Sequence, residues 1–288
     1  LACDWGPVRV FRNDRGSLTE ATEALGLKAM TGWWTGVAAG DFDGDGRLDL
    51  VVGNWGLNGQ ERTWSPLPFR AYYGEFAQDG TIQVVEAIDD PARGMTVPFR
   101  DFASIRSAIP HLRARVESHL QFSKLSVADL LGPDFPSARE LMVNTLESVV
   151  LLNRGDHFER IALPREAQWS PSFGVTVADA DGDGREDLFL SQNCFAVRPE
   201  DSRLDSGLGL WLRGNGRGGF DAVPAIESGV RIYGEQRGCA VGDFDEDGRP
   251  DLVVTENGGP VHLYLNRRGA VGLRVRLVGP DGNRFGVG

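Results

Sequence analysis

One pattern of polar and hydrophobic positions occurs three times along the chain. Residues 36–54 read GVAAGDFDGDGRLDLVVGN, residues 174–193 read GVTVADADGDGREDLFLSQN, and residues 238–257 read GCAVGDFDEDGRPDLVVTEN. Each copy has a run of small residues, an acidic stretch of the form D-x-D-x-D-G-x-x-D, three or four apolar residues and a polar stretch that ends in Asn. Repetition of this kind predicts an architecture built from similar supersecondary units.

Two further segments fit the same frame with fewer acidic residues. YYGEFAQDGTIQVVEA places Glu75, Asp79 and Gln83 in the frame, and LSVADLLGPDFPSARELMVN keeps Asp129 before it loses register. The frames start at 41, 75, 129, 179 and 243, and their uneven steps indicate a constant motif separated by loops of variable length. We expect no metal at the frames that start at 75 and 129.

Short apolar runs between the frames have the composition of β-strands. They are VRVF (8–11), SVVLLN (148–153), LGLWLRG (208–214) and VHLYLN (261–266), and several lead into a Gly-rich turn followed by Phe. Regular short strands with Gly-rich turns predict an all-β fold. About four strands per 35–60 residues is the size of a β-propeller blade.

Residues 101–131 depart from this β pattern. Their apolar residues recur every three or four positions, as on one face of a helix: Ile105, Ile109, Leu112, Val116 and Leu120. We therefore expect a small helical insertion on one blade, with Pro110 limiting its regularity.

The composition of the chain adds an excess of acid and of glycine. The 288 residues include 41 Asp+Glu against 30 Lys+Arg, a formal net charge of −11 and 38 Gly. An acid excess argues against a nucleic-acid-binding protein, which would carry a basic face. The longest apolar runs fall short of the ~18 residues that a membrane-spanning helix needs.

The spacing of the acidic residues is typical of a calcium loop. Carboxylates at i, i+2 and i+4 converge only if the chain curls around a common centre, and the Gly at i+5 permits the sharp turn. The carbonyl oxygen at i+6 and the Asp at i+8 complete a set of hard oxygen donors, which suits Ca²⁺ better than Mg²⁺ or a transition metal. The predicted ligands, with each arginine contributing its backbone carbonyl, are Asp41, Asp43, Asp45, Arg47 and Asp49; Asp179, Asp181, Asp183, Arg185 and Asp187; and Asp243, Asp245, Asp247, Arg249 and Asp251.

An EF-hand agrees with these loops at nine positions but needs a bidentate Glu at position 12 and a helix on either side. Position 12 is Val52, Leu190 or Val254, inside apolar runs, so the loop joins two strands and is not an EF-hand. An acidic solvated turn without metal would explain one such loop, whereas three complete copies favour about three Ca²⁺ sites. Three ions would add six positive charges to the net charge of −11 and leave −5.

These residues resemble the FG-GAP/VCBS repeats, which are calcium-loop β-propeller blades of integrin α-subunit heads and many secreted bacterial proteins. The resemblance covers about residues 8–267 and rests on the motifs Asp41–Asp49, Asp179–Asp187 and Asp243–Asp251. The insertion and NRRGAVGLRVRLVGPDGNRFGVG (266–288), with Gly282-Asn283-Arg284 and then Gly286, are similar to the ASPIC/UnbV (cartilage acidic protein-like) group. The resemblance implies a propeller, partial or a fragment, over 1–267, with its calcium loops between strands 1 and 2 of a blade, and the start of a C-terminal ASPIC/UnbV domain over 268–288.

If the calcium loops lie on the lower face, the ends of second strands and the starts of first strands share the upper face. This places Trp33, Trp34, Asn54, Trp55, Trp169, Asn193, Tyr233, Arg237 and Asn257 around one rim. Such a set can form a platform for a sugar or a peptide. Alternatively, the aromatic residues wedge between blades and the Asn residues cap turns. The same geometry brings Cys194 beside Cys239, either as a disulfide or as two buried thiols.

Sequence motifs for catalysis are scarce. The four histidines form no HExxH pattern, and GxSxG and Walker motifs are absent. The tripeptide Arg154-Gly155-Asp156 invites an adhesion interpretation, but it lies at the turn position of a repeat, and we take it as a coincidence.

We expect a non-enzymatic, calcium-binding propeller, secreted or at the cell surface, that serves as a binding or adhesion scaffold for a protein or carbohydrate. One alternative is a carbohydrate-active enzyme of the polysaccharide lyase type, for which the upper face offers only Arg237 and Tyr233. Another is an accessory protein of enediyne-type natural-product biosynthesis, which the UnbV resemblance suggests. Because the chain starts at Leu1 without a methionine, any export signal is expected outside this sequence.

Overall fold

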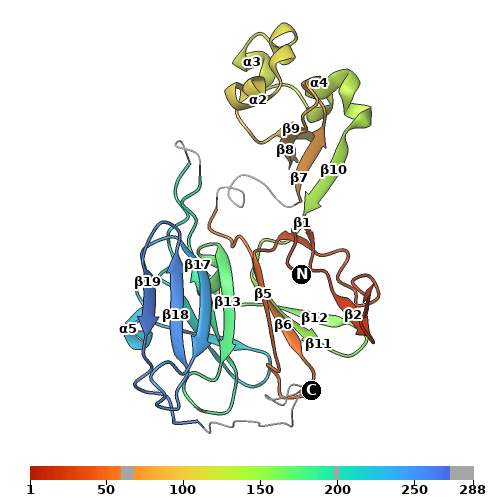
Figure 1. Ribbon diagram of the computed structural model, residues 1–288. Coiled ribbons are helices and arrows are strands. Elements are labelled where there is room, and N and C mark those ends of the chain that lie inside the picture. The colour runs from red at the N-terminus through yellow and green to blue at the C-terminus, as the bar shows by residue number, and fades with distance from the viewer. Residues whose placement is uncertain (60–67, 198–200, 273–288) are drawn as a thin grey trace.

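The computed structural model describes residues 1–59, 68–197 and 201–272 (Figure 1). Antiparallel strands dominate the described residues, and the few helices are short. The expected start of a C-terminal domain falls mostly outside the described residues, and this includes Gly282-Asn283-Arg284 and Gly286. No helix among the described residues is long and apolar enough to cross a membrane.

The first large sheet combines two hairpins that are far apart in the sequence. Its strand order is β12-β11-β6-β5, with β5 (Gly36–Gly40) and β6 (Asp49–Gly53) on either side of the first acidic loop. The other hairpin consists of β11 (Val149–Asn153) and β12 (Phe158–Ala162). Val51 on β6 lies opposite Val150 on β11, so residues 54–148 are inserted between the second and third strands of this sheet.

Two further sheets follow along the chain. The second has the order β13-β14-β15-β16, formed by β13 (Ser172–Ala178), β14 (Asp187–Gln192), β15 (Leu210–Gly214) and β16 (Phe220–Val223). The third contains β17 (Gln236–Gly242), β18 (Asp251–Glu256) and β19 (Val261–Tyr264). In all three sheets the acidic loop joins the first strand to the second, as the sequence predicts.

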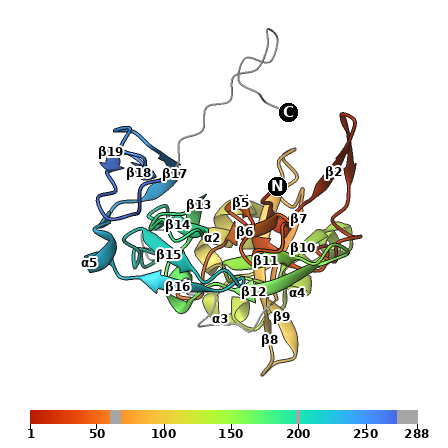
Figure 2. The same cartoon turned by 90° about the horizontal axis from the view of Figure 1, so that it is seen from below.

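The first strands of the three sheets lie side by side. β13 packs between β5 and β17, and the sheets spread outward from this line (Figures 1 and 2). Within residues 1–59, 68–197 and 201–272 this arrangement is an open fan and not a closed ring. The core between the first two sheets consists of apolar residues from their facing sides, among them Phe42, Leu152, Leu188 and Leu212.

The inserted segment forms its own sheet with a helical cover, at the top of Figure 1. The strand order is β10-β7-β8-β9, with β7 (Phe69–Gly74), β8 (Gln83–Asp90), β9 (Met95–Pro98) and β10 (Arg139–Val143). Between β9 and β10 run α2 (Phe102–Ala108), η1 (Pro110–Ala114), α3 (His119–Phe122), α4 (Val127–Leu131) and η2 (Gly132–Ser137). Tyr72 and Val85 of the sheet share a core with Ile105, Leu112 and Leu130 of this cover.

The helical stretch expected over 101–131 is therefore a series of short helices. α2 ends at Ala108 because Pro110 disfavours helical geometry at the residue before it. Four of the five residues expected on one helical face are buried: Ile105, Ile109, Leu112 and Val116. The assignment of Leu120 to this face is wrong, since this residue of α3 is 69 % exposed.

The frame predicted at 129 is also wrong. Asp129 lies in α4, where its carboxylate and the Ser126 hydroxyl form a capping box with each other's backbone N–H groups. A single Asp at the first position of the motif is insufficient to specify the loop. The frame at 75, by contrast, is present as the hairpin between β7 and β8.

The remaining elements are small. β1 (Asp4–Pro7) pairs with β4 (Thr31–Trp33), and β2 (Phe11–Asp14) pairs with β3 (Ser17–Glu20). One helical turn, η3 (Arg165–Gln168), precedes the second sheet, and α5 (Ala225–Ser228) precedes the third. The β1–β4 pair contacts β10 and thereby connects the inserted sheet to the rest of the fold.

Candidate metal centres

The three acidic loops have the same local hydrogen bonding. In the first acidic loop (41–49), the Asp41 carboxylate accepts hydrogen bonds from the backbone N–H groups of Asp45 (3.0 Å) and Gly46 (2.9 Å). Gly46 has φ of 83°, a left-handed conformation that glycine adopts without strain. Asp179 and Asp243 accept from Gly184 and Gly248 in the same way. The loops therefore curl as the spacing predicts.

The last Asp of each loop is buried and ties three segments together. Asp49 is 0 % exposed; its Oδ2 accepts from the Phe42 N–H (3.0 Å) and its Oδ1 from the Asn153 N–H (2.7 Å) at the end of β11. Asp187 and Asp251 make the corresponding pairs of hydrogen bonds. Burial raises the pKa of Asp49, and the nearby carboxylates of Asp43 and Asp45 raise it further, while the two backbone hydrogen bonds oppose the shift.

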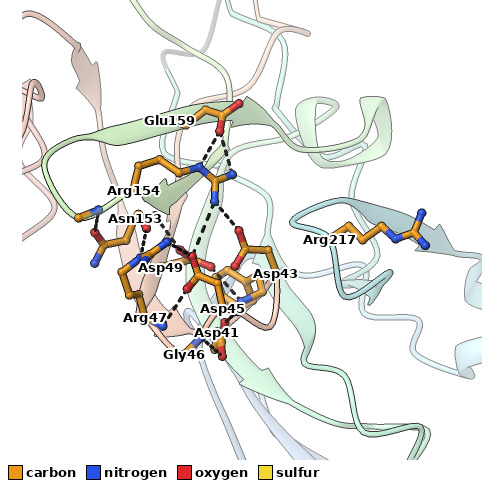
Figure 3. A network of polar contacts seen from close by, with 12 residues as sticks. Asp41, Asp43, Asp45, Gly46, Arg47, Asp49, Asn153, Arg154, Glu159 and Arg217 are labelled. Atoms are coloured by element: carbon orange, nitrogen blue, oxygen red, sulfur yellow. Dashed lines mark hydrogen bonds and ion pairs between the residues drawn. The ribbon is translucent and has the colours of Figure 1, made fainter.

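Two arginines flank each acidic loop, as Figure 3 shows for the first. Arg47 pairs with Asp45, and its Nε donates to the Asn153 carbonyl (2.8 Å). Arg154, from the turn after β11, contacts Asp43 Oδ2 at 2.5 Å and Glu159 at 2.8 Å.

The same arrangement recurs in the other two loops. There the pairs are Arg185–Asp183 with Arg213–Asp181, and Arg249–Asp247 with Arg267–Asp245. These second arginines belong to no motif that the sequence predicted. The available signal was an Arg within three residues of the end of each third strand.

Arginines thus pair with two carboxylates of each acidic loop, while other carboxylate oxygens have no such partner. Oδ1 of Asp43 and Oδ1 of Asp243 are buried and have no hydrogen-bond partner within the described residues. Buried carboxylate oxygens without a partner are costly unless a cation or a donor satisfies them.

Three carboxylate groups in each loop bring oxygens within 4.8 Å of one another: Asp41, Asp43 and Asp45; Asp179, Asp181 and Asp187; and Asp243, Asp245 and Asp251. These donors are all hard oxygens, so the residues fit a divalent cation of the Ca²⁺ type. Participation of Asp49, Asp183, Asp247 and the three arginine carbonyls stays a prediction.

The hairpin between β7 and β8 contains a fourth loop of the same shape, residues 75–83, which we call the carboxamide loop. Glu75 Oε1 accepts from the Gly80 N–H (2.9 Å), as Asp41 does from Gly46. Gln83 Oε1 accepts from the Phe76 N–H (2.7 Å), as Asp49 does from Phe42.

The interior of the carboxamide loop differs from that of the acidic loops. Gln83 Nε2 donates to the Thr81 hydroxyl (2.6 Å) and to Asp79 Oδ1 (3.3 Å). An amide group of the chain itself therefore supplies the donors in this loop, in keeping with the expectation that it holds no metal.

The structure divides the residues predicted for the upper rim into three groups. Trp33, Trp34 and Trp55 come together in one hollow at the end of the first sheet opposite its acidic loop. Asn54 and Asn193 are 0 % exposed and donate through Nδ2 to backbone carbonyls. Asn257 donates to Glu235 at 2.6 Å. These three amides hold the ends of second strands in place.

The other predicted rim residues lie apart from the hollow. The side chains of Trp169 and Tyr233 are 41 % and 73 % exposed. The Arg237 guanidinium lies 3.8 Å from the Phe173 ring centroid and pairs with Glu235 at 2.6 Å. Arg237 is thus held by structural contacts.

Cys194 and Cys239 are free thiols in the structure, and of the two thiols expected to be buried only Cys194 is, since Cys239 is half-buried. Burial raises the pKa of Cys239 to about 12, so this thiol stays protonated at neutral pH. Of the tripeptide at 154–156, Arg154 is bound by Asp43 and Glu159 and so belongs to the surroundings of the first acidic loop.

Comparison with known proteins gives matches at both ends of the described chain. Residues 1–52 match a family described as an FG-GAP-like repeat, and residues 239–272 match the FG-GAP repeat. Cartilage acidic protein 1 of Homo sapiens is 26 % identical over an alignment 209 residues long, which covers 67 % of this chain and 26 % of that protein. Its Xenopus tropicalis counterpart is 27 % identical over an alignment 299 residues long, which covers 97 % of this chain and 39 % of the relative.

Integrin alpha-IIb of Homo sapiens is 32 % identical over 145 residues, 46 % of this chain and 14 % of the integrin. The chain therefore spans well under half the length of each of these relatives. Together the matches support an FG-GAP-repeat, cartilage acidic protein-like family for the chain.

Proposed function

We propose that this FG-GAP-repeat protein is a calcium-stabilised binding or adhesion scaffold, secreted or at the cell surface, without enzymatic activity. The observation that carries the calcium part is the acidic loop that occurs three times with clustered carboxylates, and in the first and third loops one buried carboxylate oxygen has no donor within the described residues. Similarity to cartilage acidic protein 1 and integrin alpha-IIb supports the scaffold role and the location.

The proposed calcium is structural. Its ligands would be the carboxylates and the i+6 carbonyls of the three acidic loops, and the bound charge would offset the repulsion among those carboxylates. Each loop also contacts the end of the third strand through Asp49, Asp187 or Asp251. Neutralising the loop would therefore stabilise three strands of a sheet at once.

We further propose that the three sheets are blades of a partial β-propeller within residues 1–267, and that 268–288 begin an ASPIC/UnbV domain. The side-by-side first strands and the acidic loop between strands 1 and 2 support the blade assignment. The partner would be a protein or a carbohydrate bound at the end of the sheets opposite the acidic loops.

Calcium removal tests this proposal. Extracellular calcium modules bind with Kd of about 10⁻⁴–10⁻³ M, so 2 mM Ca²⁺ adds up to about 1.8 kcal/mol per site at the tighter end of that range. Three such sites in one transition would raise the Tm by roughly 10–20 °C relative to EDTA. Calorimetry in 2 mM CaCl₂ and in EDTA measures this difference.

A matched pair of variants controls for nonspecific effects of charge. Asp43→Asn removes a carboxylate whose inward oxygen lacks a partner, and is expected to reduce the calcium-dependent rise in Tm. Asp79→Asn makes the same change in the carboxamide loop and should leave the rise intact. An identical melting curve with and without EDTA would contradict the proposal.

A further inference from the structure

A hollow of about 530 Å³ opens between the first sheet, the β1–β4 pair and the inserted sheet. Its walls are aromatic, and we call it the aromatic hollow: Trp5, Trp33, Trp34, Trp55, Phe69 and Phe99. Its volume lies within the range of about 300–1,000 Å³ that is typical of small-molecule sites, which often occur at junctions between domains. The chain has seven Trp, and four of them line this one space.

The aromatic walls are held rigidly. The Trp33 ring lies 5.3 Å from Trp5, 5.5 Å from Trp55 and 5.3 Å from Phe69, in each case edge to face. Phe69 in turn lies 4.8 Å from Phe99, beside β9 of the inserted sheet. Such interlocked rings offer a preformed surface, so a ligand would lose little free energy in ordering it.

The indole N–H groups of these walls are not satisfied by the protein. Nε1 of Trp33, Trp34 and Trp55 is buried and has no hydrogen-bond acceptor within the described residues. Trp34 is only 3 % exposed as a whole residue. Buried Trp side chains usually find a partner for this group, so three unpaired donors around one hollow indicate that acceptors are missing.

Charged groups that donate and charged groups that accept hydrogen bonds also line the aromatic hollow. Asp4 and Glu86 offer acceptor oxygens, and Arg100 offers donors while pairing with Glu86 beside the Phe99 ring. The hollow therefore combines flat apolar surfaces, N–H donors and carboxylate acceptors.

We infer that the aromatic hollow binds a saccharide. A pyranose ring has a C–H face that packs on an indole ring, and its hydroxyl groups both accept from N–H donors and donate to carboxylates. An ammonium cation would suit the aromatic rings and acids but brings no acceptor for the indole N–H groups. An apolar ligand would leave both kinds of polar group unpaired. The inference rests on the proposed binding function and names the class of its ligand.

Titration with defined oligosaccharides tests the inference. The probes are β-1,4-linked tetrasaccharides of glucose, xylose, mannose and N-acetylglucosamine, with tetramethylammonium chloride as the cation alternative. Binding of at least one tetrasaccharide at millimolar or lower concentration should change the tryptophan fluorescence and give a saturating heat in calorimetry.

Two variants locate the site. Trp55→Phe keeps an aromatic ring but removes one indole N–H, and should weaken saccharide binding about tenfold, the loss expected for one hydrogen bond. Trp169→Phe makes the same change at an exposed indole outside the aromatic hollow and should leave the affinity unchanged. The calcium-dependent Tm of both variants serves as the check that they fold.

Three outcomes would overturn the inference. They are the absence of binding by all four saccharides at 10 mM, saturable binding of tetramethylammonium alone, and equal weakening by the two Trp→Phe variants. Because calcium-dependent melting is measured on the same samples, failure here with a normal calcium response leaves the proposed scaffold standing. Loss of the calcium response would refute that proposal separately.

Discussion

The first acidic loop and the carboxamide loop share one backbone and differ in what lies inside it. In both, the first residue accepts from the Gly at i+5, and the last residue accepts from the N–H of the residue after the first. Asp49 and Gln83 thus occupy equivalent positions. The loop conformation follows from hydrogen bonds between side-chain oxygens and the backbone, which carboxylates and a carboxamide form equally well.

The interiors of the two loops carry different charge. The first acidic loop has four carboxylates, with one oxygen of Asp43 unpartnered. The carboxamide loop has two, Glu75 and Asp79, and the Gln83 amide donates to Asp79. The repeat therefore needs a source of positive charge or of hydrogen-bond donors at its centre. One loop supplies a donor from its own chain, whereas the other requires it from a cation or from arginines.

Truncating the last residue of each loop is expected to cause the largest loss of stability among the variants that compare the two loops. Asp49→Ala leaves the buried N–H groups of Phe42 and Asn153 without acceptors, at a cost of about 3 kcal/mol. Gln83→Ala leaves the N–H groups of Phe76 and Ala77 unpaired, at about 2 kcal/mol. Urea denaturation with calcium and with EDTA measures both losses.

Only Asp49→Ala should also reduce the stabilisation that calcium provides. An equal change in the calcium response of the two variants would show that the loops do not differ in the way proposed.

A charge placed inside the carboxamide loop is expected to cause an intermediate loss of stability that depends on pH. Gln83→Glu replaces a donor by a carboxylate next to Asp79, in a position where the wild-type side chain is 8 % exposed. We expect a loss of about 2 kcal/mol at pH 7, because repulsion and burial both disfavour the charge.

The direction with pH follows from the pKa of the introduced carboxylate, which is raised in the folded state. The folded protein therefore binds its proton first, and the lost stability returns as the pH falls from the raised pKa towards the unfolded value of about 4.3. Denaturation of both proteins at pH 7 and pH 5 in calcium measures the difference between them. A deficit that stays constant with pH would mean that the defect is steric and not electrostatic.

The smallest expected loss of stability comes from two glycine variants, which test whether the two loops have the same backbone conformation. Gly46 and Gly80 have φ of 83° and 80°, and a Cβ added at either would meet nothing within 4 Å. Gly46→Ala and Gly80→Ala should therefore cost about 1 kcal/mol each, through the left-handed conformation alone. Thermal denaturation in calcium compares the two, and a twofold or larger disparity would indicate that the loops tolerate the strained conformation differently.

Local sequence determined much of this protein. The i, i+2, i+4 and i+8 spacing with Gly at i+5 was sufficient to predict the three acidic loops between paired strands, and the frame at 75 was found from Glu75, Asp79 and Gln83. These features depend on contacts within nine residues, so the spacing itself encodes them. Asp129 shows the limit, since one residue of the motif was overridden by a helix-capping box with Ser126.

The tertiary structure decided what depends on segments far apart in the chain. Val51 pairs with Val150 across the whole inserted segment, and no spacing rule predicts such a pairing. Asp43 and Arg154 are 111 residues apart in the chain, and the rings around Trp33 come from three other segments, at Trp5, Trp55 and Phe69. These contacts form only when sheets pack together and bury their apolar faces. The sequence by itself could therefore predict the loops and their chemistry, while the arginine partners and the aromatic hollow required the folded structure.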